Sequence, residues 1–444
     1  MSIFKQYDVR GKYPQEINEK VIKKIVQVLI KKYKAKKIML GHDMRKSSDV
    51  LSRVFVKSAV KAGADVLNIR LASVGVFAFA QNKYKTDLAV YLTASHIGRN
   101  YNGVKILNKN GTALHGNDLQ EIKAKIDSTV IDVKSKSGQE KNIDIMPQYL
   151  DWLFAQINIK KLKFLNIILD ASNGAIAPVA SASLSTLPGE FMKINFGLQD
   201  KFIDHSLDPL KKDSHKQIKK LIKQELSDLG VLWDGDGDRI VFFDETGKFV
   251  HPYYINILLS KIMLIKYSNA LILHDNRLKL GLEKEIIKSS GNLKIIKSGW
   301  PNFISKMQKY SAVFSCETSA HYYFCVNKNA IADGILPLLL IIEYLSENNI
   351  SLSQAVSEFT EKYFTTHEIN FKDIDFKNAC AKLQMHFKNI QPLFLDGLSF
   401  TTENWHMNFR ESQTEPDLVR LNIEANSRKL LVNKKREILD IIKN

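Results

Sequence analysis

Three aspartates in one short loop have the types and the spacing to hold a metal ion. Asp234, Asp236 and Asp238 alternate with glycines in the run Asp-Gly-Asp-Gly-Asp-Arg over residues 234–239. Three carboxylates that converge on a tight turn repel one another unless a positive charge lies among them. A hard divalent cation is the natural partner, because it prefers oxygen ligands. The alternative is an exposed acidic turn that binds nothing.

The flanks of this loop decide which cation it suits. The spacing begins like a calcium-binding EF-hand, with Glu245 at the twelfth position, but Arg239 stands at the sixth, where that loop needs glycine. Residues 229–233 and 240–243 are short apolar runs rich in β-forming side chains, so the loop should join two strands. These features exclude a calcium sensor and predict a Mg²⁺ site beside a phosphate-binding arginine.

A second loop places a hydroxyl beside an imidazole. Residues 88–92 read as a strand, and Ser95 and His96 follow almost directly. The serine could be a nucleophile with the histidine as its base, or it could equally cap the next turn. The chain has no G-x-S-x-G elbow, which argues against an α/β-hydrolase.

Two more loops carry polar side chains beyond the end of a strand, where open α/β sheets bind their ligands. Glu317, Ser319 and His321 would suit the hydroxyls of a sugar. In residues 410–416, an arginine, two hydroxyls and the backbone of a tight loop would suit a phosphate dianion. A structural histidine and a solvated turn are the alternatives.

The composition is that of a globular enzyme. The 444 residues predict about three domains, give or take one. The longest apolar run, residues 335–342, is too short to span a membrane, and the N-terminal residues lack the apolar core of a signal peptide. Three scattered cysteines, Cys316, Cys325 and Cys380, suit a reducing compartment, so we expect a cytoplasmic protein.

The net charge of +17 does not indicate nucleic-acid binding. The excess is mostly lysine spread over expected helix faces, whereas nucleic-acid binders concentrate basic and aromatic residues in one segment. The charge could help to steer anionic substrates.

Strands and helices alternate along most of the chain, which predicts α/β domains with parallel or mixed sheets. The last eighty or so residues instead show an α+β pattern. The expected strands are 37–40, 65–69, 88–92, 164–169, 271–273, 294–296, 312–314, 398–401 and 418–423, with C-terminal helices at 376–387 and 427–442.

Five ordered motifs resemble the α-D-phosphohexomutase superfamily, which includes phosphoglucomutases and phosphomannomutases. They lie at 7–11, 93–96 with 102–105, 234–239, 317–321 and 410–416. Residues 317–324, 405–410 and 419–424 are most similar to bacterial phosphomannomutases. The resemblance implies four domains around a central cleft. Three are similar α/β domains with mixed sheets, at 1–145, 146–250 and 251–365, and a C-terminal α+β domain spans 366–444.

The resemblance also implies a role for each motif. Ser95 would carry a phosphoryl group, and one Mg²⁺ per subunit would bind a phosphoryl oxygen of Ser95 together with Asp234, Asp236 and Asp238. The other expected catalytic residues are Arg10, His96, Lys105 and His321. The expected substrate-binding residues are Tyr7, Arg239, Lys297, Glu317, Ser319, Arg410, Ser412, Gln413 and Thr414.

Among these residues, Lys105 is the expected general acid and base. A lysine acts as a base only if its pKa falls well below about 10, which burial and nearby cations could achieve.

The implied reaction is that of a phosphomannomutase, which interconverts mannose 6-phosphate and mannose 1-phosphate through a hexose 1,6-bisphosphate. The same bisphosphate would serve as activator. Alternatives are a phosphoglucomutase, a dual-specificity enzyme, a phosphoglucosamine mutase and a non-catalytic relative that binds sugar phosphates. The expected partners are small hexose phosphates, with no nucleic acid and no membrane, and the expected state is a monomer or a weak dimer. Nucleotide-sugar supply is the pathway that the family implies.

Three positions depart from the family pattern. Ile97-Gly98 replaces Asn-Pro after the serine and histidine, which removes a rigid residue and predicts a more mobile loop. Gln413 replaces an asparagine in the phosphate loop. Trp300 follows Gly299 where a histidine is common, so sugar contacts at that loop do not carry over directly.

Overall fold

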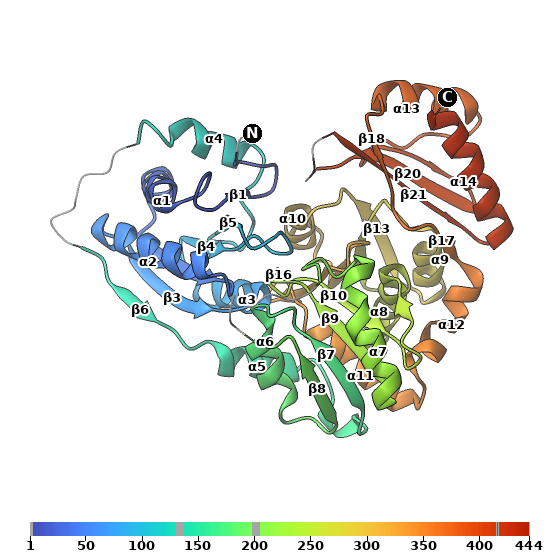
Figure 1. The fold of residues 1–444 in the computed structure, drawn as a ribbon, viewed down its shortest axis with the longest axis horizontal. Coiled ribbons are helices and arrows are strands. Elements are labelled where there is room, and N and C mark those ends of the chain that lie inside the picture. The colour runs from blue at the N-terminus through green and yellow to red at the C-terminus, as the bar shows by residue number, and fades with distance from the viewer. Residues whose placement is uncertain (1–2, 130–136, 198–204, 414, 416, 444) are drawn as a thin grey trace. The chain divides into compact units, whose positions relative to one another are not determined.

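The computed structural model describes residues 3–129, 137–197, 205–413, 415 and 417–443. The chain forms two compact units (Figure 1). The first unit comprises residues 1–250 and 321–351, and the second comprises residues 251–320 and 352–444. Among the described residues, no helix is long and apolar enough to cross a membrane.

The first unit opens with a six-stranded mixed sheet (Figure 1). Its central strands β2, β3 and β4 are parallel, and β5 pairs antiparallel with both β4 and β1. In sheet order the strands are β1 (Val9–Lys12), β5 (Tyr101–Asn108), β4 (Leu88–Leu92), β2 (Lys37–His42), β3 (Asp65–Leu71) and β6 (Glu140–Asn142).

Helices cover this sheet because its central strands are apolar on both faces. Helix α1 shows how the sequence determines where a helix begins and which of its faces is buried. Asn18 caps its first turn by accepting from the N–H groups of Lys20 and Val21, and an apolar stripe that includes Ile22 and Ile25 enters the core. The helices are α1 (Glu19–Tyr33), α2 (Lys46–Lys61), α3 (Val74–Tyr84) and α4 (Asn117–Lys125).

A second, five-stranded sheet in the first unit carries the aspartate loop. Strands β9 and β10 form an antiparallel pair around residues 234–239, while β7, β8 and β9 are parallel. In order, the strands are β11 (Phe249–Val250), β10 (Ile240–Phe243), β9 (Leu229–Trp233), β7 (Asn166–Asp170) and β8 (Glu190–Ile194). The unit also contains α5 (Met146–Phe154), α6 (Ile176–Leu184), α7 (Lys216–Glu225), β15 (Tyr322–Val326), β16 (Asn329–Ala332) and α11 (Leu336–Asn348).

The second unit begins with three parallel strands and four helices. The strands are β13 (Asn292–Ile296), β12 (Leu271–Asp275) and β14 (Phe314–Cys316), with β12 between the other two. The helices are α8 (Pro252–Lys266), α9 (Leu280–Lys288), α10 (Trp300–Tyr310) and α12 (Leu352–Lys362).

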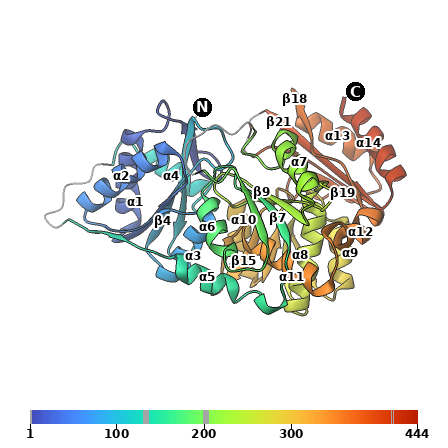
Figure 2. The same ribbon diagram turned by 60° about the horizontal axis from the view of Figure 1, so that its bottom comes forward.

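The C-terminal part of the second unit is an antiparallel sheet with two helices packed against it. Helices α13 and α14 lie side by side (Figure 2), and they pack against β20 and β21, respectively. The elements are β17 (Phe364–Thr365), β18 (Ile369–Lys372), α13 (Phe376–His386), β19 (Leu398–Thr401), β20 (Trp405–Glu411), β21 (Leu418–Ala425) and α14 (Arg428–Lys443).

The fold class predicted from the sequence is confirmed: mixed α/β sheets precede a C-terminal antiparallel sheet. The strands expected at 88–92 and 398–401 have those bounds. The strand expected at 312–314 lies instead at Phe314–Cys316: the Ala312 N–H still donates to Met307 of α10, and the Val313 N–H donates to Leu271 of β12. The four domain boundaries and the central cleft stay predictions.

One buried hydrogen bond joins two elements of the first unit. The Tyr149 hydroxyl of α5 donates to Asp333 Oδ2 at 2.7 Å, and Asp333 Oδ1 caps α11 by accepting from the N–H groups of Ile335 and Leu336. Tyr149→Phe should lower the stability by about 1–3 kcal/mol, because a buried carboxylate oxygen loses its donor. Thermal unfolding checks this, with the exposed Tyr267→Phe as control. Equal melting temperatures would refute it.

Candidate active site

The aspartate loop folds so that its three carboxylates converge. Asp234, Asp236 and Asp238 are buried, and one oxygen of each lies within 4.8 Å of the others. The glycines between them are structural requirements. Gly237 has φ +75°, and a Cβ on Gly235 would lie 2.7 Å from the Ser95 carbonyl oxygen. The predicted strand–loop–strand unit is therefore confirmed, with the serine loop packed against it.

The serine loop meets the aspartate loop directly. Ser95 follows β4 in a left-handed conformation (φ +50°), and its hydroxyl donates to Asp234 Oδ2 at 2.9 Å. His96 Nδ1 lies 3.1 Å from the same hydroxyl oxygen. The Thr93 hydroxyl accepts from the Ser95 N–H at 2.8 Å and donates to Asp236 Oδ2 at 3.1 Å. Side chains predicted from separate motifs therefore form one cluster in the first unit.

Lys105 supplies the positive charge closest to the aspartates. From β5, its Nζ donates to Asp236 Oδ2 and Asp238 Oδ2, both at 2.9 Å. Burial opposes the charge of Lys105, but the two carboxylates outweigh burial and raise its pKa. This direction is opposite to the one expected for a general base. The expectation considered cations near Lys105 and missed that its nearest neighbours are anions.

The three carboxylates differ in how well their charge is compensated. Burial, followed by repulsion from Asp238 and Asp236, raises the pKa of Asp234 well above its ordinary value. Burial and Asp238 also raise the pKa of Asp236. Burial acts the same way on Asp238, but Lys105 and His321 outweigh it and hold its pKa well below the ordinary value. The loop therefore carries more negative charge than its protein neighbours neutralise.

The aspartate loop fits a hard cation. Asp236 Oδ1 is buried and receives no hydrogen bond from the described residues, so an oxygen ligand stands unused inside the cluster. Asp234, Asp236, Asp238 and the Ser95 oxygen would hold the ion, since Mg²⁺ binds carboxylate and hydroxyl or phosphoryl oxygens.

Other expected catalytic residues flank this cluster. His321 Nε2 lies 3.3 Å from Asp238 Oδ1, and Arg239 Nε donates to the same histidine nitrogen at 3.3 Å. Arg10, on β1, forms an ion pair with Asp8 at 2.5 Å. Burial and the charges of Arg239 and Arg10 hold the pKa of His96 well below its ordinary value.

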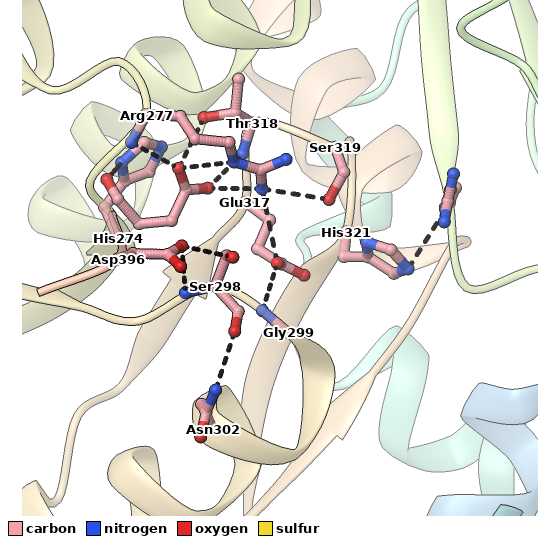
Figure 3. Close-up of polar contacts among 12 residues, drawn as sticks. His274, Arg277, Ser298, Gly299, Asn302, Glu317, Thr318, Ser319, His321 and Asp396 are labelled. Carbon is pink, nitrogen blue, oxygen red and sulfur yellow. Dashed lines mark hydrogen bonds and ion pairs between the residues drawn. The ribbon is translucent and has the colours of Figure 1, made fainter. Parts of the chain in front are cut away.

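A second polar cluster forms in the second unit, around the expected sugar-binding loop (Figure 3). Arg277 binds Asp275 through two hydrogen bonds of 2.8 Å, and its Nη2 lies 3.4 Å from Glu317 Oε1 and 3.3 Å from Ser319 Oγ. Asp275 also accepts from the N–H and hydroxyl of Thr318. This network fixes the loop from which Glu317 and Ser319 project.

The neighbouring loop after β13 is tied into the same network (Figure 3). Asp396 Oδ2 accepts from the Ser298 N–H at 3.2 Å and from its hydroxyl at 2.5 Å. The next N–H, of Gly299, donates to Glu317 Oε1 at 2.9 Å. Asp396 is therefore connected to Glu317 through the backbone of Ser298 and Gly299.

The expected phosphate site contains paired arginines. Arg410 and Arg420 share the carboxylate of Glu368, with the nearest N–O distances at 3.7 Å and 3.0 Å. Arg410 is 5% exposed, and its Nε has no acceptor among the described residues. This leaves donor capacity for an anion.

The remaining predicted residues are less closely connected. Tyr7 is half-buried ahead of β1, and Lys297 is exposed after β13. Ser412 accepts from the Glu415 N–H at 3.1 Å, and Gln413 beside it is half-buried. Thr414 lies outside the described residues. The roles of all predicted site residues stay predictions.

Sequence reasoning missed several residues that shape these clusters. Asp43 and Arg45 come directly after β2, while Asp275 is the last residue of β12 and Arg277 follows it. Both pairs stand in a His-Asp-x-Arg run, at 42–45 and 274–277. This repeated run is the feature of the sequence that could have identified these four residues. Glu368 and Asp396 gave none, because each stands alone in its local sequence.

Asp234→Asn tests the cation site while preserving its shape. The amide oxygen can still accept from the N–H groups of Gly237 and Arg239, which now bind Asp234 Oδ1. Removing one of three clustered charges should leave the metal-free melting temperature equal or higher. Mg²⁺ at about 100 times its Kd should stabilise the unaltered protein by about 2.7 kcal/mol and the variant not at all.

Scanning calorimetry with and without MgCl₂ measures both effects. The exposed Asp373→Asn is the matched control and should respond to Mg²⁺ like the unaltered protein. An equal Mg²⁺ response in Asp234→Asn would place the ion elsewhere.

Comparison with known proteins agrees with this geometry. The family description "Phosphoglucomutase/phosphomannomutase, alpha/beta/alpha domain" matches as domain I over residues 1–130, domain II over 147–247 and domain III over 251–363. Phosphohexose mutases of Xanthomonas campestris pv. campestris (strain B100) are 31% identical over 446 residues, which is 99% of each chain. The phosphomannomutase of Escherichia coli (strain K12) is 31% identical over 438 residues, covering 96% of this chain and 95% of the relative.

A solved structure shares the fold. The phosphoglucomutase/phosphomannomutase family protein from Burkholderia thailandensis has a TM-score of 0.89 and 22% identity, covering 99% of this chain and 97% of its own. Three family domains in order and relatives at 31% identity over nearly the full length leave one assignment. The chain belongs to the phosphoglucomutase/phosphomannomutase family of the α-D-phosphohexomutase superfamily and is a phosphohexomutase, an isomerase that moves a phosphoryl group.

Proposed function

We propose that this phosphohexomutase is a phosphomannomutase that interconverts mannose 6-phosphate and mannose 1-phosphate. The observation that carries the mechanism is the contact between the Ser95 hydroxyl and Asp234, at 2.9 Å, inside the buried aspartate cluster. A hydroxyl held against a candidate cation site, with a histidine beside it, suits phosphoryl transfer to and from serine.

In the proposed cycle, the phosphoserine P–O bond breaks as a bond forms to the free hydroxyl of the hexose monophosphate. The hydroxyl proton leaves with a base, and a hexose 1,6-bisphosphate results. The departing Ser95 oxygen takes up a proton. The other phosphate of the bisphosphate then returns to Ser95, the Ser95 proton passes to a base, and the departing sugar oxygen takes up a proton. His96 Nδ1, which lies 3.1 Å from the Ser95 oxygen, is the candidate base. The isomeric monophosphate leaves, and the phosphoserine is restored. Bound Mg²⁺ would neutralise charge on the transferred group.

Lys105 has a different role in this proposal from the one that the family resemblance implies. Because its neighbours Asp236 and Asp238 keep it charged, it supports the transferred phosphoryl group electrostatically. Arg10, Arg239 and His321 would add positive charge or hydrogen-bond donors around the same group.

The substrate would be held by the second unit. Glu317 and Ser319 suit the sugar hydroxyls, and Arg410 suits the phosphate that is not reacting. Glucose and mannose have the same configuration at carbons 3 and 4, so contacts to those hydroxyls do not separate the two sugars. The preference for mannose rests on the Escherichia coli phosphomannomutase relative, and phosphoglucomutase activity is the second candidate.

Ser95→Ala tests the chemistry. The intact mass of the unaltered protein should show a fraction with one added phosphate, and incubation with glucose 1,6-bisphosphate should increase that fraction. Ser95→Ala should show neither the phosphate nor mutase activity, since it removes the hydroxyl that contacts Asp234, whereas the Thr93 hydroxyl against Asp236 is held by the N–H of residue 95. The exposed Ser128→Ala is the control.

Initial rates on mannose 1-phosphate, glucose 1-phosphate and glucosamine 1-phosphate then rank the substrates. Full activity in Ser95→Ala would overturn the mechanism, whereas a higher kcat/KM on glucose 1-phosphate would overturn only the mannose preference.

Asp396→Ala tests how the sugar loop is held. Losing both hydrogen bonds to Ser298 should free the Gly299 N–H from Glu317, which weakens sugar binding. We expect KM for the hexose monophosphate to rise by about tenfold, the effect of roughly one lost hydrogen bond to a charged group. Phosphorylation of Ser95 by the bisphosphate should change less. Asp396→Asn keeps an acceptor oxygen and should restore KM. An unchanged KM in Asp396→Ala would exclude this role.

A further inference from the structure

The loop that carries Ser95 is folded around one guanidinium group. Arg45 Nη2 donates to the carbonyl oxygens of Ser95 and Ile97 at 2.8 Å and 2.7 Å. Its Nη1 donates to the carbonyl oxygens of Gly98 and Tyr101 at 2.9 Å and 3.2 Å. Its Nε donates to Asp43 Oδ2 at 2.9 Å. All five N–H bonds of the side chain therefore have acceptors, four of them in one loop.

The arginine itself is rigidly placed. It is 5% exposed and lies at the start of α2, where its own N–H donates to Asp43 Oδ1 at 3.1 Å. Asp43 is fully buried and also accepts from the Ser48 hydroxyl at 2.6 Å. A planar donor group held in this way defines the positions of the carbonyl oxygens around it.

Arg45 binds the loop only through backbone oxygens, so its hold does not depend on the loop side chains. This explains how Ile97 and Gly98 can stand where the family carries Asn-Pro. A Cβ on Gly98 would meet nothing within 4 Å, so close packing does not require glycine at this position. The hydrogen bonds from Arg45 supply the restraint on the loop that a proline would give.

Ser95 needs such a restraint. Its left-handed conformation, with φ +50°, is one that non-glycine residues adopt only at an energetic cost. Within the loop, the backbone adds hydrogen bonds from Ile97 N–H to Ala94 and from Tyr101 N–H to Gly98. The Arg45 bond to the Ser95 carbonyl acts on the strained residue itself.

The second His-Asp-x-Arg run in the chain shows what is particular to Arg45. Each run begins at the end of a strand whose parallel neighbour leads into a loop of the candidate site: β2 beside β4, and β12 beside β14. Arg277 donates to side chains of that loop, Glu317 and Ser319. Arg45 instead donates only to backbone oxygens of its loop.

We propose that Arg45 is a positioning residue that holds the phosphoserine loop through its carbonyl oxygens and thereby keeps the Ser95 oxygen against the aspartate cluster. This role rests on the proposed function, because the loop is positioned for phosphoryl transfer at Ser95. Arg45 touches neither the transferred phosphoryl group nor the sugar in this proposal, so its loss should lower the rate of transfer and leave substrate binding unchanged.

Arg45→Lys tests the proposal, because lysine can keep the ion pair with Asp43 but cannot reach four diverging carbonyl oxygens from one point. The rate of Ser95 phosphorylation by glucose 1,6-bisphosphate, followed by intact mass, should fall about 100-fold, as expected for a misplacement of about 1 Å. The kcat should fall with it, and KM for the hexose monophosphate should not change. Arg53→Lys, an exposed arginine on the same helix, is the matched control and should behave like the unaltered protein.

Hydrogen–deuterium exchange gives a readout that does not require activity. In Arg45→Lys, amide exchange should rise in residues 94–101 and stay unchanged in the rest of the first sheet. Phosphorylation at the unaltered rate would show that only the charge pair with Asp43 matters and would overturn the proposal. A rise in exchange across the whole sheet would also overturn it, since Arg45 would then serve general stability.

Different measurements test the proposed function and the role of Arg45. If the unaltered protein accepts no phosphate from the bisphosphate, the proposed function is wrong. The exchange measurement still decides whether Arg45 restrains the loop.

Discussion

The mutual repulsion of three buried carboxylates is the constraint on which the rest of the site depends. Asp234, Asp236 and Asp238 are placed so close together that their charges cannot persist without compensation. The protein supplies only part of it, through Lys105 and backbone N–H groups. The remaining excess suits the loop to a divalent cation, and the same excess accounts for the cations gathered around it.

The geometry needed for this convergence fixes the neighbouring serine loop. Gly235 allows the aspartate loop to approach the Ser95 carbonyl oxygen more closely than any side chain would permit. Ser95 is held from one side by Asp234 and from the other by Arg45, and it keeps a strained backbone between them. Strain at a catalytic residue persists only where the surroundings over-determine it, and here two independent sets of hydrogen bonds do so.

The sequence was most informative where one motif contains a whole local structure. The loop at 234–239 and its flanking strands were predictable because glycine spacing and β-forming runs act over a few residues. Contacts between distant segments were not predictable from the sequence. Glu368, for example, lies 42 residues before Arg410, and nothing near Glu368 indicates an arginine partner. The pKa direction of Lys105 was wrong for the same reason, since it depends on aspartates more than 130 residues away. Only the repeated His-Asp-x-Arg run could have revealed Arg45.

That repeat shows how one structural device serves two needs. In the proposed cycle the Ser95 oxygen must stay in one place whatever ligand is bound, and the hydrogen bonds from Arg45 to the loop backbone suit that need. A binding loop must let its side chains exchange partners with a ligand. Arg277 makes long contacts of 3.4 Å and 3.3 Å to Glu317 and Ser319, which a sugar hydroxyl could replace at little cost. The contacts of the two arginines thus match the roles proposed for their loops, phosphoryl transfer at Ser95 and substrate binding at Glu317 and Ser319.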